Sequence, residues 1–168
     1  MAFFIMLKNI NRSLIYIYKV SGYIGAIFLI CVAVFILTGI MSRIFGFYIR
    51  GLAEYSGYSM AASSFFALAY TFHNNAHIRI TLFLEKLENK KKKITEVWCL
   101  LVASFFSGFL AFYFIKMTII SFKFEERSEG ADEIFVWIPQ TCVAIGSSIF
   151  FICVLHHFIF SIFNKKIN

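Results

Sequence analysis

Four strongly apolar stretches occupy most of this chain of 168 residues. They cover roughly residues 20–41, 53–72, 97–115 and 134–155. Each has about the ~20 residues that an α-helix needs to cross the ~30 Å hydrocarbon core of a bilayer. Apolar residues make up 60% of the chain and charged residues 15%, which leaves too little polar chain for a separate soluble domain. We therefore expect an all-α membrane protein in which residues 1–168 form one domain with four transmembrane helices.

The basic residues are distributed unevenly between the segments that join these stretches. Lys and Arg number three, six and two in the first, third and last segments, eleven in all, against five in the other two. Because cytoplasmic loops carry an excess of Lys and Arg, both termini and the middle loop are predicted to be cytoplasmic. The same residues suit contact with anionic phospholipids. No solvent-facing basic module remains that could bind nucleic acid.

The first residues of the chain have an amphipathic pattern. Over residues 3–19, Lys8, Arg12 and Lys19 fall on one side of a helix and apolar residues on the other. Such a segment is typical of a helix that lies flat at the membrane surface, joined to the first span by a bend at Ser21-Gly22. The alternative is that residues 3–19 simply continue the first span as a longer, tilted helix. The apolar run is too long for a signal peptide, so we expect this span to be retained.

Small residues recur along the second stretch. Ala53, Gly57 and Ala61 are spaced four apart, and a row of this kind lets another helix approach closely in lipid. The approaching helix could belong to this chain or to another subunit.

The segment between the third and fourth stretches is locally acidic, although the net charge of the chain is +7. Its acidic residues are Glu125, Glu126, Glu129, Asp132 and Glu133, beside Lys123 and Arg127. The segment could be a solvated loop or a docking surface for a partner outside the cell membrane. Trp137 and the only proline, Pro139, follow at the start of the fourth stretch, where proline is tolerated because the first helical N–H groups have no intrahelical acceptors.

Few side chains in this sequence suggest chemistry. Glu54 lies near the outer edge of the second stretch, where it could pair with Arg50 or serve a small proton-coupled exporter. His73 and His77 at one membrane face, with His156 and His157 at the same face, could ligate haem b as an imidazole pair. There is no phosphate-binding loop, no paired deep carboxylates and no nucleophile–base set, so we expect no enzyme activity, no bound metal and no cofactor.

Two sequence patterns resemble a known family. The first comprises Glu54 at the start of the second span and the motif His77-Ile78-Arg79-Ile80 beyond its inner end. The second is Val136-Trp137-Ile138-Pro139-Gln140, followed by Gly146. Together with Arg43 just after the first span, these patterns resemble the small membrane subunit (DctQ-like) of tripartite ATP-independent periplasmic (TRAP) transporters.

The resemblance implies a function exercised with partners. The partners would be a large sodium-coupled elevator subunit in the bacterial inner membrane and a periplasmic substrate-binding protein. The small subunit would be a non-catalytic scaffold for uptake of an organic acid such as a C4-dicarboxylate, a sugar acid or sialic acid. In this reading Arg43, Arg50 and Glu54 brace the outer end, while His77 and Arg79 anchor the inner end to the partner or to lipid. Gly57, Trp137 and Pro139 complete the expected interface, and Glu125, Glu126, Arg127 and Glu129 would receive the binding protein.

Overall fold

The computed structural model describes residues 2–74, 89–130 and 133–162, and these form four α-helices. The helices are α1 (Ala2–Ile44), α2 (Leu52–His73), α4 (Asn89–Lys123) and α5 (Trp137–Ile162). Among the described residues, extended pairing is limited to one isolated bridge between Arg127 and Phe135. The predicted all-α fold is therefore confirmed.

The first helix is one continuous element of 43 residues. The bend predicted at Ser21-Gly22 is wrong, because both residues lie within α1, and the alternative of an uninterrupted helix matches the structure. At 1.5 Å per residue α1 is about 64 Å long, roughly twice the thickness of a hydrocarbon core. One bilayer crossing therefore cannot take up all of α1, and a flat membrane-surface position for residues 3–19 stays a prediction.

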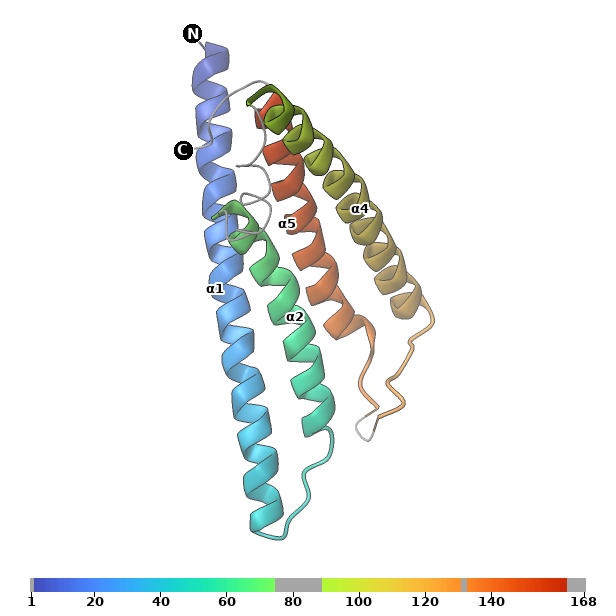
Figure 1. The fold of residues 1–168 in the computed structure, drawn as a ribbon. Coiled ribbons are helices and arrows are strands. Elements are labelled where there is room, and N and C mark those ends of the chain that lie inside the picture. The colour runs from blue at the N-terminus through green and yellow to red at the C-terminus, as the bar shows by residue number, and fades with distance from the viewer. Residues whose placement is uncertain (1, 75–88, 131–132, 163–168) are drawn as a thin grey trace.

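The four helices lie side by side in the order α1, α2, α5, α4 (Figure 1). The helices α1 and α4 run in one direction, and the two central helices, α2 and α5, run in the other. As a result, the start of α1 and the end of α5 lie at one end of the molecule. The connections 45–51 and 124–136 lie at the other, which we call the loop end. Successive helices along the chain alternate in direction, which is why the start of α1 and the end of α5 share one end; the cytoplasmic location of the termini stays a prediction.

Glycines allow close contact at each of the three helix interfaces. A Cβ on Gly25 of α1 would lie 3.1 Å from backbone atoms of α2, and one on Gly108 of α4 would lie 2.9 Å from the Phe151 ring of α5. At Gly146 of α5 the same atom would lie 2.9 Å from Cβ of Phe65 and 3.0 Å from its carbonyl carbon. Helices in lipid associate mainly through such close packing, since lipid chains are as apolar as the side chains.

The second helix is rich in hydroxyl side chains and lies between α1 and α5. The Ser63 hydroxyl donates to the Gly25 carbonyl at 2.9 Å, and the Ser21 hydroxyl of α1 donates to the Phe66 carbonyl at 2.6 Å. The Cys153 thiol of α5 donates to the Ala69 carbonyl at 3.5 Å. These bonds satisfy side-chain donors that lipid could not.

Three segments of the described helices are long and apolar enough to cross a membrane. They are Asn11–Ile44, Lys93–Lys123 and Trp137–Ile162. They contain the first and third predicted spans and all of the fourth, 134–155, except its first three residues. The hydroxyl-rich α2 is not among them, so the second span stays a prediction. The third predicted span, 97–115, is shorter than its helix, which continues to Lys123.

Candidate functional site

The loop end of the molecule is held together by contacts between α2 and the connection 124–136. The Tyr58 hydroxyl of α2 lies 2.9 Å from the Ser128 hydroxyl. The Glu54 carboxylate lies directly against Gly130 and leaves no room there for a side chain. Glu54 is half-buried in this position. The acidic loop is therefore fixed to α2 as well as to the helices on either side of it, and Glu54 takes part in that attachment.

The connection 124–136 begins with a tight helix ending. Glu125 has a left-handed conformation (φ 49°), and the Glu126 N–H donates to the Ser121 carbonyl at 3.1 Å. This is the bond of a Schellman motif, in which the left-handed position is usually glycine. The Glu126 carboxylate then accepts from the Ser121 hydroxyl at 2.7 Å. Glu126 is thus part of the loop's own structure.

The remaining charges of this loop divide into paired and solvent-facing groups. Arg127 lies 3.9 Å from the Glu133 carboxylate and 4.9 Å from the centre of the Phe135 ring. Glu125 and Glu129 are exposed. Glu126 and Glu133 are also exposed, but Glu126 is bonded to Ser121 and Glu133 is paired with Arg127. Asp132 lies outside the described residues.

Arg43 and Glu54 line a shared cavity of about 330 Å³ at the loop end, between α1 and the start of α2. Gly46 and Gly51 provide the left-handed conformations (φ 74° and 78°) that turn the chain from α1 into α2. Arg43 and Arg50 are exposed. Arg43 and Glu54 therefore lie in one region, with Arg50 in the connection between their helices, and a bracing role for these three residues stays a prediction.

The row of small residues on α2 is largely open among the described residues, with only Ala61 half-buried. A Cβ on Gly57 would have nothing within 4 Å, and Ala53 and Gly57 are exposed. The buried face of α2 carries other small residues, namely Ser59, Ala62, Ser63 and Ala69. The four-residue spacing therefore identified a real small-residue face, but not the one that binds α1 and α5.

The start of α5 matches its predicted features. Trp137 is the first residue of the helix, and its ring packs edge-on against Phe122 at 5.4 Å. Pro139 lies in the first turn, where N–H groups have no intrahelical acceptor and the missing N–H of proline therefore costs no hydrogen bond.

At the end opposite the loops, histidines from two helices meet a tyrosine from a third. His73 Nδ1 of α2 lies 3.3 Å from His157 Nε2 of α5, and the Tyr18 hydroxyl of α1 lies 3.4 Å from His156 Nδ1. The Tyr18 ring also contacts the His73 ring, at 5.4 Å between centroids. We call these four residues the histidine cluster. It lies at the centre of the most buried part of the chain, beside Cys153.

Two members of the histidine cluster are poorly suited to carry charge. His156 is 7% exposed, and its Nε2 atom is buried without a hydrogen-bond partner. His73 lies one residue beyond the second predicted span, where burial and then the nearby Lys19 ammonium lower the pKa of its imidazole. Both causes favour the neutral ring.

The cluster does not fit a haem held between His73 and His157. Their ring nitrogens are in direct hydrogen-bond contact, which leaves no space for an iron atom and a porphyrin ring between them. Within the part of the chain that the structure describes, no three His, Cys, Asp or Glu side chains are arranged to hold a metal ion. His77 and Arg79, predicted as inner anchors, lie outside the described residues.

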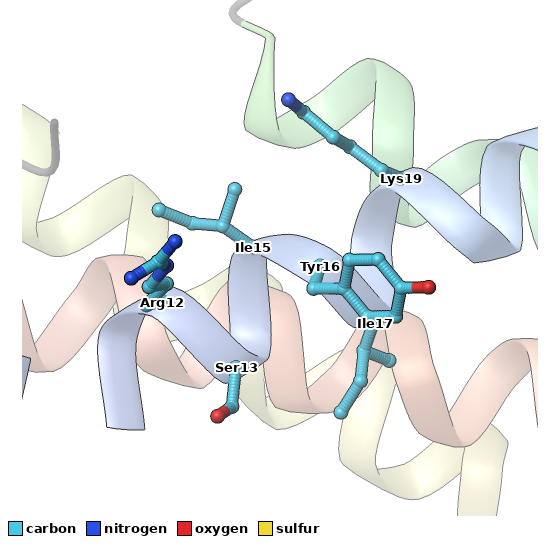
Figure 2. A pocket seen from close by; sticks show the side chains of 6 residues that line it. All are labelled: Arg12, Ser13, Ile15, Tyr16, Ile17 and Lys19. Carbon is cyan, nitrogen blue, oxygen red and sulfur yellow. The ribbon is translucent and has the colours of Figure 1, made fainter. Parts of the chain in front are cut away.

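A shallow groove of about 510 Å³ follows the side of α1 near the cluster (Figure 2). Arg12 and Lys19 stand at its two ends, with Tyr16 between them. Its basic lining is the amphipathic pattern recognised in the sequence. Tyr18 could not be singled out from the sequence, because an isolated tyrosine in an apolar helix forms no recognisable pattern.

The comparisons with known proteins give one match. Residues 24–163 match the family described as tripartite ATP-independent periplasmic transporters, DctQ component. No curated protein and no solved structure matches the chain.

Proposed function

Because this chain belongs to the DctQ component family of the tripartite ATP-independent periplasmic transporters, it is the small membrane subunit of such a transporter, and we propose that it scaffolds the large subunit. In this proposal the large subunit moves sodium and substrate, and a periplasmic binding protein delivers an organic acid such as a C4-dicarboxylate, a sugar acid or sialic acid. The small subunit adds a stationary wall in the inner membrane, with both its termini in the cytoplasm.

The observation that carries this proposal is the open, one-layer arrangement of the helices. The described helices α1 and α4 stand at the two edges, and α4 exposes a series of large rings, including Phe105, Phe106, Phe109 and Phe112. The polar side chains at the helix interfaces bond to backbone carbonyls of the neighbouring helix. Such a layer supplies broad apolar surface for a partner and for lipid, but no polar route for an organic acid.

The exposed small-residue face of α2 is the surface that we assign to the large subunit. Ala53 and Gly57 lie on it, followed by Met60 and Ser64. Because Gly57 has no neighbour in this chain, Gly57→Leu should leave the isolated subunit folded and reduce its co-purification with the large subunit. Gly57→Ala is the matched control, since one methyl group changes the surface little. Full recovery of the complex with Gly57→Leu would reject this face.

Braces and anchors at the two ends complete the proposed interface. We assign Arg43, Arg50 and Glu54 to the outer end, and His77 and Arg79 to lipid phosphate or the partner at the inner end. Arg79→Ala and Glu54→Ala should each lower the yield of complex or the rate of uptake. Unchanged assembly and transport in both variants would refute these assignments.

The outward carboxylates of the acidic loop are the proposed contact for the binding protein. Glu125→Lys with Glu129→Lys should weaken docking to the assembled transporter and reverse the sign of its salt dependence. Glu126→Gln is a structural control, because Glu126 is bonded to Ser121 within the loop. Equal affinities of the double variant and the natural complex at low salt would contradict the proposal.

Transport by this chain alone is the outcome that separates a scaffold from an exporter. Glu54 lies against the loop at one end of the layer, whereas a proton-coupled exporter needs a carboxylate within its transport path. Vesicles that contain only this subunit should therefore move neither organic acids nor protons faster than empty vesicles. Solute movement in those vesicles would overturn the scaffold proposal.

A further inference from the structure

The contact between His73 and His157 places strict limits on the protons that the pair can hold. A hydrogen bond between two ring nitrogens needs an N–H on one and a lone pair on the other. At 3.3 Å this is the side-chain bond that joins the ends of α2 and α5. It persists when both rings are neutral or when one is charged. When both are charged, each nitrogen carries a proton, so the bond is lost and two cations face each other.

The described residues around the pair provide no negative charge that would compensate a second proton. The groups that face it are Tyr18 and Lys19 from α1 and Cys153 and His156 from α5. The charges that act on the three imidazoles come from Lys19 and from the other imidazoles, and all of these are positive or neutral. The buried His156 Nε2 has no hydrogen-bond partner among the described residues, so no acceptor there would stabilise a protonated His156 ring.

We propose that His73 and His157 form a proton-binding site that closes this end of the layer when at most one proton is added and opens it when a second arrives. Opening separates α5 from α2 and from Tyr18 of α1, while the contacts at the loop end stay in place. The proposal does not depend on the transporter assignment, because it concerns only contacts within this chain.

The direction of the pH effect follows from the proton count. The open state binds more protons than the closed state once the pH falls below about 6.5, the ordinary value for histidine. Stability of the closed end is therefore complete above that pH and is lost as the pH falls through the lower titration range of the closed pair. If opening takes up one proton, the opening equilibrium should rise about tenfold per pH unit in this range.

Hydrogen exchange of the full chain in lipid nanodiscs tests the proposal. Between pH 6.5 and 5.5, amides of residues 153–160 should exchange about fivefold faster after correction for the intrinsic pH dependence, since the open-state ring is already half-protonated at about pH 6.5. Residues 141–147, in the other half of the same helix, serve as the internal control and should not change. In His73→Gln the amide side chain can donate and accept at every pH, so the response should fall below about twofold.

Nitrogen NMR of ¹⁵N-histidine-labelled protein provides a second measurement, and its main result comes from the natural chain. In the natural chain, two of the four imidazoles should titrate in two coupled steps, and His157→Gln should remove this behaviour. Independent titration of all four rings near pH 6.5, or equal pH responses in both halves of α5, would overturn the proposal.

Discussion

The close approach of α5 to the backbone of α2 at Gly146 allows a quantitative test of how these two helices pack. Gly146 of α5 has no room for a side chain: a Cβ there would lie 2.9 Å from Phe65 Cβ, 3.0 Å from the Phe65 carbonyl carbon and 3.1 Å from the Phe66 nitrogen. Carbon atoms in ordinary contact lie ~3.5–4.0 Å apart, so Gly146→Ala must move α5 away by roughly 0.5–1 Å. Two of the three obstructing atoms belong to the backbone, so a rotamer change cannot relieve the clash.

The loss of stability caused by the clash can be separated from the stability that alanine adds to a helix relative to glycine. Overpacking of this kind destabilises by about 1–3 kcal/mol, while Gly→Ala in a helix interior contributes about 1 kcal/mol in the opposite direction. Gly57→Ala makes the same chemical change on α2 with nothing within 4 Å, so it has only the favourable term. The difference in unfolding free energy between the two variants should therefore be about 1–3 kcal/mol, with Gly146→Ala the less stable.

Reversible unfolding in mixed micelles, followed by circular dichroism during an SDS titration, measures this difference. Both variants and the natural chain are compared at one lipid-to-detergent ratio, so that the solvent term cancels. If Gly146→Ala were as stable as Gly57→Ala, the close approach of α5 to the α2 backbone would be refuted.

Other predictions concern the loop end and the buried core. Tyr58→Phe removes the bond to Ser128 and should cost about 0.5–1.5 kcal/mol, detected as faster hydrogen exchange in residues 126–130 but not in the centre of α5. Glu125→Gly relieves a left-handed conformation and should stabilise the chain by about 1 kcal/mol in the same SDS titration, even though it removes a proposed docking charge; a destabilised variant would contradict the helix ending described above. A small membrane-permeable maleimide should label the exposed Cys99 and spare the fully buried Cys153 until the chain is unfolded, and equal labelling rates measured by mass spectrometry would count against the core.

The all-helical class was predictable because the bilayer imposes it. Stretches of about 20 apolar residues can satisfy their backbone groups in lipid only as helices. The first, third and fourth spans were located for this reason, and Pro139 was placed correctly in the first turn of its helix. The family was also predictable, because its motifs are short and can be identified without knowing which helices are in contact.

The composition of α2 shows why hydropathy is not sufficient to identify the second span. Its serines and tyrosines lower its hydropathy, yet Ser63 is bonded to α1 and Tyr58 to the connection 124–136. A hydropathy pattern cannot distinguish a polar helix that its neighbours satisfy from one that does not cross the membrane. The bend predicted at Ser21-Gly22 was wrong for a similar reason, since both residues are used for close contact with α2 inside a continuous helix.

Sequence alone thus determined the solvent, the helical class and the family, because each depends on local composition or short motifs. Only the tertiary structure decided which small-residue face of α2 is buried, and that Gly57 is left open. It also brought together His73 and His157, 84 positions apart in the chain. Such contacts depend on the order and rotation of whole helices, and in a chain that is apolar on nearly every side, hydrophobic periodicity does not specify either one.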